Sequence, residues 1–210
     1  MNKLDLSLYL VADLRPDTMR NEWLQQVIAA VAGGVTVVQL RAKDVSGRFF
    51  YETALALRQR LDFLSVPLII NDRLDIAMAI DAAGLHVGQD DLPPQVVRHL
   101  WGEQKLVGVS AHSVAEAQTA VAAGADYLGA GAMFATTTKT DTTCLALHEL
   151  TAMTAAVSVP IVAIGGIKAD NTALVMTSGC AGVAVSSAIM AAEDAKQAAT
   201  AIKQQFAAGK

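Results

Sequence analysis

The sequence predicts an α/β fold, a single-domain (β/α)₈ TIM barrel that spans residues 1–210. Three observations support this prediction. Short apolar runs rich in Val, Ile and Leu recur along the chain, as expected for strands buried on both faces of a parallel sheet. Between them lie segments with apolar residues three and four positions apart, which is typical of amphipathic helices. Eight such pairs in 210 residues give about 26 residues per unit, close to the roughly 30 of a compact βαβ module.

The eight apolar runs follow one another in chain order. They are LSLYLVAD at 6–13, VTVVQLRA at 35–42, PLIIND at 67–72, GLHVGQ at 84–89, KLVGVSA at 105–111, DYLGAGAMF at 126–134, PIVAIGG at 160–166 and GVAVSSAI at 182–189. Helical spacing is found at 22–31, 49–61, 115–123 and about 191–207. An open doubly wound sheet is the alternative fold, but it usually has fewer strands at this length, and the first strand lacks a G-x-G-x-x-G loop.

Composition excludes several classes of function. The net charge is −4 and no basic block occurs, so the sequence gives no sign of nucleic-acid binding. No apolar stretch approaches the roughly 20 residues that span a bilayer, and the short first run ends beside Asp13 and Arg15, unlike a signal peptide. Cys144 and Cys180 share no metal or redox spacing. We therefore expect a soluble cytoplasmic protein with small-molecule partners and no membrane, and a homo-oligomer is left open.

The barrel prediction specifies where the active site lies, because barrel sites form at the carboxyl ends of the strands. The second apolar run ends in Gln39, Arg41 and Lys43, spaced two apart, so all three side chains share one face. If Leu40 faces outward, these three point into the barrel mouth. Two cations and an amide there suit an anion together with a flat heterocycle. A solvated loop start is the alternative interpretation.

Acidic residues follow the third and fourth runs. Asp72 comes after Asn71 in the third, and Asp91 follows the fourth. Carboxylates from neighbouring barrel loops converge in space, and such hard oxygen ligands favour Mg²⁺. Asp72 alone is equally compatible with a helix cap. His86 lies inside the fourth run, and we interpret it as a buried, hydrogen-bonded histidine without a direct catalytic role.

Polar and Gly-rich segments also follow four later runs. A Ser110–His112 catalytic pair is conceivable, but no nucleophile elbow is present, and a hydrogen-bonding Ser110 is the preferred interpretation. Loops after strands seven and eight of many barrels hold phosphate. This chain offers candidates in those loops and in the threonine-rich loop after the sixth run: Thr136, Thr137, Thr138, Lys139, Gly165, Gly166, Ser186 and Ser187.

Seven motifs together resemble the thiamine phosphate synthase family. In order and spacing they are QLRAKD, INDRLDIA, LHVGQDDLP, GVSAHS, GADYLGAGAMFATTTKTD, PIVAIGGI and GVAVSSAI. The resemblance runs from about Leu8 to Ile189, nearly the whole chain. It implies a transferase that joins a hydroxymethylpyrimidine diphosphate to a thiazole phosphate or its carboxylate form, with Mg²⁺ as cofactor. It also implies a dissociative reaction, in which no general base is required.

The resemblance further implies the roles of individual residues. On the pyrimidine diphosphate side it puts Gln39, Arg41, Lys43, Asn71, Ser110 and Lys139, of which Arg41, Lys43, Ser110 and Lys139 take part in catalysis. It puts the thiazole phosphate against Thr136, Thr137, Thr138, Gly166, Ser186 and Ser187, and Mg²⁺ on Asp72 and Asp91. Two positions depart from the family pattern: Ala135 stands where proline is common and Ser186 where valine is common.

Alternative functions remain at this level. A thiazole tautomerase-like isomerase on the same barrel would handle only the thiazole phosphate and would not need Asp72 with Asp91. A non-catalytic barrel that binds a phosphate ligand is a second alternative, but it has no use for metal ligands. A sugar-phosphate isomerase or epimerase would require a catalytic Glu or His at a strand end, and none is evident.

Overall fold

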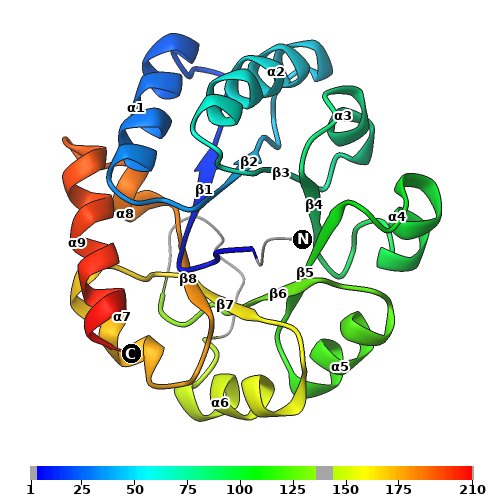
Figure 1. Ribbon diagram of the computed structural model, residues 1–210, viewed down its shortest axis with the longest axis vertical. Helices are drawn as coiled ribbons and strands as arrows, with labels where there is room; N and C mark the ends of the chain where they lie inside the picture. Colours follow the sequence, from blue (N-terminus) through cyan, green and yellow to red (C-terminus); the bar gives the residue numbers. More distant parts are fainter. Residues whose placement is uncertain (1–3, 136–143, 210) are drawn as a thin grey trace.

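The structure, a computed structural model, describes residues 4–135 and 144–209. Its eight parallel strands close into a barrel in which each strand pairs with its neighbours in the sequence, and β8 pairs with β1. The helices form a ring outside the strands (Figure 1). The predicted (β/α)₈ barrel is therefore confirmed, and the open-sheet alternative is excluded.

The strands lie within the eight apolar runs. They are β1 Leu8–Asp13, β2 Val37–Arg41, β3 Leu68–Asn71, β4 Gly84–Val87, β5 Leu106–Ala111, β6 Tyr127–Ala130, β7 Ile161–Ile164 and β8 Gly182–Val185. The helices are α1 Arg20–Ala32, α2 Gly47–Phe63, α3 Leu74–Ala79, α4 Pro94–Trp101, α5 Val114–Ala122, α6 Leu147–Ala156, α7 Ala169–Met176, α8 Ser187–Met190 and α9 Ala195–Ala208.

The C-terminal part differs from the sequence prediction in one respect. The eighth apolar run does not continue as a strand to residue 189, because β8 ends at Val185 and the chain turns into the short helix α8. The backbone oxygen of Ser186 accepts from the N–H groups of Ile189 and Met190 at 3.0 and 2.9 Å. The last helix then begins at Ala195, after Asp194 caps it through Gln197 N at 2.9 Å.

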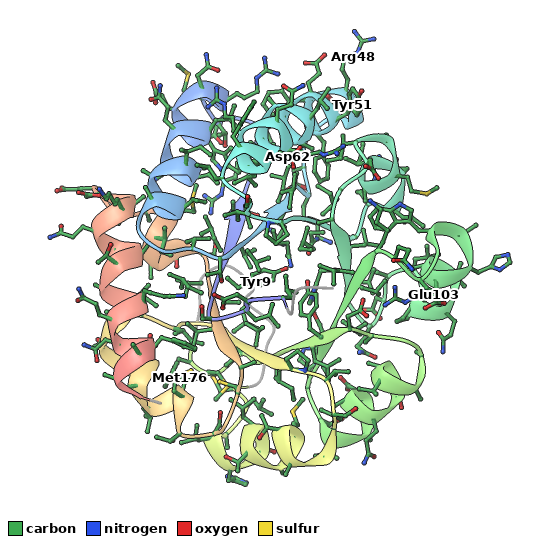
Figure 2. The ribbon with its side chains drawn as sticks, viewed as in Figure 1. Tyr9, Arg48, Tyr51, Asp62, Glu103 and Met176 are labelled. Atoms are coloured by element: carbon green, nitrogen blue, oxygen red, sulfur yellow. The ribbon has the colours of Figure 1, made fainter. Side chains whose placement is uncertain are left out.

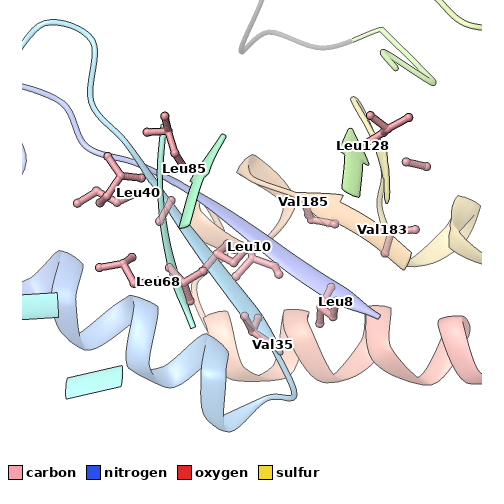
Figure 3. Close-up of a cluster of buried hydrophobic side chains, with 14 of the residues drawn as sticks. Leu8, Leu10, Val35, Leu40, Leu68, Leu85, Leu128, Val183 and Val185 are labelled. Carbon is pink, nitrogen blue, oxygen red and sulfur yellow. The ribbon is translucent and has the colours of Figure 1, made fainter. Parts of the chain in front are cut away.

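Apolar side chains form two separate layers. The outer layer lies between the strands and the helices, and Figure 3 shows part of it, including Leu8, Leu10, Leu40, Leu68, Leu85, Leu128, Val183 and Val185. The inner cluster lies inside the barrel and consists of Leu6, Tyr9, Val11, Val37, Ile69, Tyr127, Val162 and Ala184. Leu6 precedes β1 and packs at the amino end, so the barrel interior is filled below the site.

Strand alternation assigns side chains to these two layers. In β4, Leu85 and Val87 belong to the outer layer, while His86 between them faces the interior. In β2, Leu40 belongs to the outer layer, and Gln39 faces inward. The period of two along each strand thus separates positions that stabilise the fold from positions that line the site. Among the described helices, none is long and apolar enough to cross a membrane.

Candidate active site

A cavity of about 270 Å³ opens at the carboxyl ends of the strands. Its wall includes every predicted site residue that the structure describes, namely Gln39, Arg41, Lys43, Asn71, Asp72, Asp91, Ser110, Gly166, Ser186 and Ser187. The fold brings these residues together from six strand ends, as the barrel prediction requires. Thr136, Thr137, Thr138 and Lys139 lie outside the described residues.

The end of β2 contributes an amide and two cations to one wall of the cavity. Gln39 is 5% exposed, and its Nε2 donates to the hydroxyl of Tyr9 at 2.8 Å. Arg41 Nη1 donates to Asp13 Oδ1 at 2.5 Å. Asp13 ends β1 directly opposite Arg41 in the strand register, so its carboxylate fixes the guanidinium at the mouth. The sequence interpretation did not identify Asp13, although its position at a strand end is the signal that would have found it.

Two carboxylates meet on the next part of the wall. Burial raises the pKa of Asp72, a hydrogen bond from Lys43 Nζ lowers it, and the neighbouring Asp91 carboxylate raises it again. Asp91 is itself held by the backbone N–H of Gly88, which donates to its Oδ2 at 2.8 Å. The structure does not support the helix-cap interpretation of Asp72, because α3 has Arg73 at its N-cap and no side-chain hydrogen bond there.

Asp72 also has an unusual backbone conformation. Its φ is 60°, in the left-handed region that residues with a Cβ rarely adopt. Its N–H donates to the backbone oxygen of His86 at 2.9 Å, which ties the end of β3 to β4. Strained conformations of this kind often occur at functional sites, where the surrounding structure holds them in place.

Ser110 lies at the carboxyl end of β5 and its hydrogen-bond partner is His86. The Ser110 Oγ is 3.0 Å from His86 Nε2, and the Ser110 backbone oxygen accepts from Gln89 Nε2 at 2.6 Å. His112 is exposed, and its Nδ1 contacts Glu116 Oε2 at 3.0 Å. The structure therefore pairs Ser110 with a histidine from the neighbouring strand, and not with His112.

The opposite wall is formed by a glycine turn that packs closely against the chain segment after β6. Gly165 and Gly166 follow β7 with φ values of 100° and 63°, which favour glycine. A Cβ on Gly166 would lie 2.7 Å from the backbone oxygen of Ala135, so a side chain does not fit there. Ser187, the first residue of α8, and Lys168 complete this wall. Lys168 is a cation that the sequence interpretation did not identify, although it stands two residues after the glycine pair.

Two tyrosines at the bottom of the cavity were also not identified from the sequence. Tyr9 and Tyr127 are 2% and 1% exposed, and both line the cavity. Figure 2 shows Tyr9 near the middle of the ring of strands. A tyrosine at an inward position of a buried strand needs a partner for its hydroxyl, and that requirement is the signal that could have found them.

A closed barrel with a charged cavity at the carboxyl ends of its strands defines the class of (β/α)₈-barrel enzymes. Comparison with known proteins gives the family. Residues 8–189 match the family described as thiamine monophosphate synthase. The thiamine-phosphate synthase of Clostridium beijerinckii is 47% identical over 205 residues, which cover 97% of each chain.

Two further comparisons agree. The thiamine-phosphate synthase of Enterococcus faecalis is 50% identical over 188 residues, covering 90% of this chain and 88% of that protein. The solved structure of thiamine phosphate pyrophosphorylase from Pyrococcus furiosus has a TM-score of 0.88 and 33% identity, with 98% of each chain covered. This chain belongs to the thiamine monophosphate synthase family, and its activity is that of a thiamine-phosphate synthase, a transferase.

Proposed function

We propose that the chain joins 4-amino-2-methyl-5-hydroxymethylpyrimidine diphosphate to 4-methyl-5-(2-phosphoethyl)thiazole, or to the carboxylate form of that thiazole phosphate. The products are thiamine phosphate and diphosphate. One observation carries the proposal beyond family membership: the cavity has two differently built walls. Lys43, Asp72 and Asp91 form a charged wall that contains two carboxylates, while Gly166, Ser187 and Lys168 form a wall of backbone and hydroxyl groups with one cation. Two walls suit two substrates, whereas the tautomerase-like alternative requires only one.

The charged wall suits the pyrimidine diphosphate. Gln39 and Asn71 present amides at inward positions of β2 and β3, where a pyrimidine ring needs donors and acceptors. Arg41 and Lys43 supply positive charge for the diphosphate, which becomes more negative as the C–O bond breaks. Charges already held in place stabilise that transition state most strongly. Ser110 adds a hydroxyl donor at the same end of the cavity.

The second wall suits the phosphate of the thiazole. Backbone N–H groups of glycine turns and serine hydroxyls are common phosphate ligands, and barrels often bind phosphate after strands seven and eight, beside a short extra helix. The short helix α8 follows β8 in this chain. Lys168 gives this wall a cation, which Gly166, Ser186 and Ser187 alone would lack.

The residues present fit a Mg²⁺ ion. Asp72 and Asp91 offer two carboxylates close enough for Asp91 to raise the pKa of Asp72, and a divalent cation relieves that repulsion. No cluster of three or more His, Cys, Asp or Glu occurs in the part of the chain that the structure describes. Mg²⁺ is commonly held by one or two carboxylates plus substrate phosphates, which agrees with this donor set. When bound, the ion would neutralise charge on the departing diphosphate.

The reaction does not require a protein base in this proposal. His86 is the buried histidine nearest the site, and burial lowers its pKa to about 4, so it is neutral at pH 7. Its two ring nitrogens are already paired with Tyr127 and Ser110. The substrate's own bond to diphosphate breaks first, and the thiazole nitrogen uses its lone pair to form the new C–N bond.

The test is formation of thiamine phosphate by the purified protein. The protein is mixed with Mg²⁺ and both heterocycles, and the product is followed by mass spectrometry. Reactions that lack one heterocycle, or contain EDTA in excess over Mg²⁺, serve as controls. Product only in the complete mixture supports the proposal, and turnover of the thiazole phosphate alone into an isomer supports the tautomerase-like alternative.

A further inference from the structure

Five polar side chains form one continuous hydrogen-bonded chain across the barrel interior. Gln39 Nε2 is 2.8 Å from the Tyr9 hydroxyl, and the Tyr9 hydroxyl is 2.9 Å from that of Tyr127. The Tyr127 hydroxyl is 3.2 Å from His86 Nδ1, and His86 Nε2 is 3.0 Å from Ser110 Oγ. This polar chain connects side chains from five strands and links Gln39 on β2 to Ser110 on β5.

The backbone leaves room for the polar chain at two glycines. A Cβ on Gly108 in β5 would lie 2.2 Å from Tyr127 Cζ and 2.5 Å from His86 Nδ1. A Cβ on Gly129 in β6 would lie 3.2 Å from His86 Cε1. Contacts near 2 Å are far inside van der Waals distance, so any side chain at Gly108 displaces the Tyr127–His86 contact.

The number of protons in the polar chain is fixed by burial. Burial raises the pKa values of the Tyr9 and Tyr127 hydroxyls far enough that both stay protonated. His86 is buried and its two ring nitrogens face the hydroxyls of Tyr127 and Ser110, so the ring is neutral and carries one N–H at pH 7–8. Tyr9, Tyr127, His86 and Ser110 thus carry one transferable proton each, and every contact between neighbours needs one of them.

Only two arrangements of these protons make every contact and also leave no buried tyrosine O–H without an acceptor. If the Gln39 amide N–H donates to Tyr9, then Tyr9 donates to Tyr127, Tyr127 donates to His86 Nδ1, and His86 Nε2–H donates to Ser110. If an acceptor replaces that N–H, every bond reverses, and Ser110 must donate to His86. An intermediate arrangement leaves a buried polar group without its partner, which is costly.

We propose that the polar chain is a positioning relay in which the Gln39 amide, by donating to Tyr9, holds His86 in its Nε2–H form and leaves the Ser110 proton free to donate to the substrate. Under the proposed function, on which this use of the relay rests, the recipient is the diphosphate oxygen. Recognition of the pyrimidine at Gln39 and hydrogen bonding to the leaving group at Ser110 are thereby coupled. Tyr9 and Tyr127 act through the relay as positioning residues.

The first experiment needs no substrate. Histidine is labelled with ¹⁵N in the full-length protein, and long-range ¹H–¹⁵N NMR spectra at pH 7–8 report which ring nitrogen carries the proton. The relay predicts the Nε2–H form for His86. A wild-type His86 in the Nδ1–H form would overturn the relay.

The sharpest variant is Gln39→Glu, examined at pH 8, where the new carboxylate can only accept. The relay predicts that Tyr9 then donates to it, that all the bonds reverse, and that His86 changes to the Nδ1–H form. Adding Tyr9→Phe to Gln39→Glu breaks the connection and returns His86 to the Nε2–H form, because Tyr127 again donates to Nδ1. If His86 stays in the Nε2–H form in a folded Gln39→Glu variant, the proposal is wrong.

Tyr51→Phe is the matched control. Tyr51 is the one tyrosine of the sequence outside the polar chain; it lies on α2, is 37% exposed and does not line the cavity. Loss of its hydroxyl removes the same atoms as Tyr9→Phe or Tyr127→Phe without cutting the relay. The His86 spectrum and the rate of thiamine phosphate formation are both expected to match the wild type.

The second experiment measures catalysis with Tyr127→Phe, which keeps the ring and removes one link. We expect kcat to fall roughly tenfold, about one hydrogen bond, while KM for the thiazole phosphate stays within about twofold. An unchanged kcat in the folded variant would overturn the relay's catalytic role. If the His86 tautomer changes with Gln39→Glu but the protein makes no thiamine phosphate, the proposed function is wrong and the relay stands. If the protein makes thiamine phosphate but the His86 tautomer does not change with Gln39→Glu, the relay is wrong and the proposed function stands.

Discussion

The two sides of the barrel wall use the same strands for opposite purposes. The outer layer consists of apolar residues packed under the helices, among them Leu85 and Leu40. The interior begins as an apolar cluster at the amino end and becomes polar toward the carboxyl end, where Gln39 and His86 are buried at 5% and 8% exposure. His86 and Leu85 are adjacent in β4. The comparison indicates that stability and chemistry are separated by a single step along the strand, because side chains alternate between faces.

Because of this separation, truncation of an outer-layer side chain should reduce stability without changing the chemistry. Leu85→Ala removes buried methyl groups and should lower the free energy of unfolding by about 2–5 kcal/mol. Urea unfolding followed by circular dichroism gives the change, and kcat per folded molecule is expected to stay within about twofold. Leu100→Ala is the control, since Leu100 is 54% exposed on α4 and surface changes usually stay within about 0.5 kcal/mol. A large fall in kcat for Leu85→Ala would break the comparison.

The converse change is made at the cavity wall. Asp91→Asn removes one carboxylate charge from the proposed Mg²⁺ site while keeping the shape of the side chain. We expect kcat/KM to fall roughly 10²-fold to 10³-fold, as for the loss of other preorganised electrostatic groups, with little change in the unfolding midpoint. Initial rates over a Mg²⁺ titration measure this effect. The neighbouring Asp90 is exposed, so Asp90→Asn should behave as the wild type, and equal losses in both variants would remove Asp91 from the metal site.

The two cavity walls can be separated in the same way. Lys43→Ala should weaken binding of the pyrimidine diphosphate by roughly tenfold to a hundredfold, the usual contribution of a hydrogen bond to a charged group. Lys168→Ala should affect the thiazole phosphate instead, because Lys168 stands beside Gly166 on the opposite wall. Calorimetric titration of each ligand into each variant gives four dissociation constants. If both variants weakened the same ligand, the assignment of substrates to walls would be wrong.

The smallest expected effect is a dependence of stability on pH that arises from one interior residue. Burial lowers the pKa of His86 to about 4, below the roughly 6.5 expected in the unfolded chain. Between these values the unfolded state binds a proton that the folded state excludes, so stability is lost as the pH falls from about 6.5 to 4. The contribution between pH 7 and 5 is roughly 2 kcal/mol.

His86→Gln removes this titration and keeps hydrogen-bonding capacity. Its unfolding free energy should therefore fall less between pH 7 and 5 than that of the wild type, when both are measured by urea titration at each pH. Comparing the two proteins cancels the contribution of the carboxylates, which also titrate in acid. Parallel pH profiles would show that His86 is not buried in its neutral form.

The sequence by itself determined the fold and the position of the site. Eight β-branched runs with helical segments between them permitted a closed parallel barrel, because each run had to be buried on both faces. That closure alone brings Arg41, Asp72, Ser110 and Ser187 to one cavity, although they are far apart in the chain. The spacing of two in Gln39, Arg41 and Lys43 was visible in the sequence because strand alternation is a local property.

Only the tertiary structure decided which side chains are partners. The Asp13–Arg41 pair, the Lys43–Asp72 contact and the His86–Ser110 contact all join different strands. The register between strands and the side-chain rotamers set such contacts, and no local pattern encodes either of them.

The same reason explains the polar chain and the end of the eighth run. Tyr9 and Tyr127 are 118 positions apart, and their hydroxyls meet only because β1 and β6 face each other across the closed barrel. The eighth run extends to Ile189 in the sequence, but β8 ends at Val185, and the backbone of Ser186 accepts the first hydrogen bonds of α8 and turns the chain. The sequence specified which face of a strand each side chain occupies, whereas the contacts between side chains across the barrel form only once the sheet has closed.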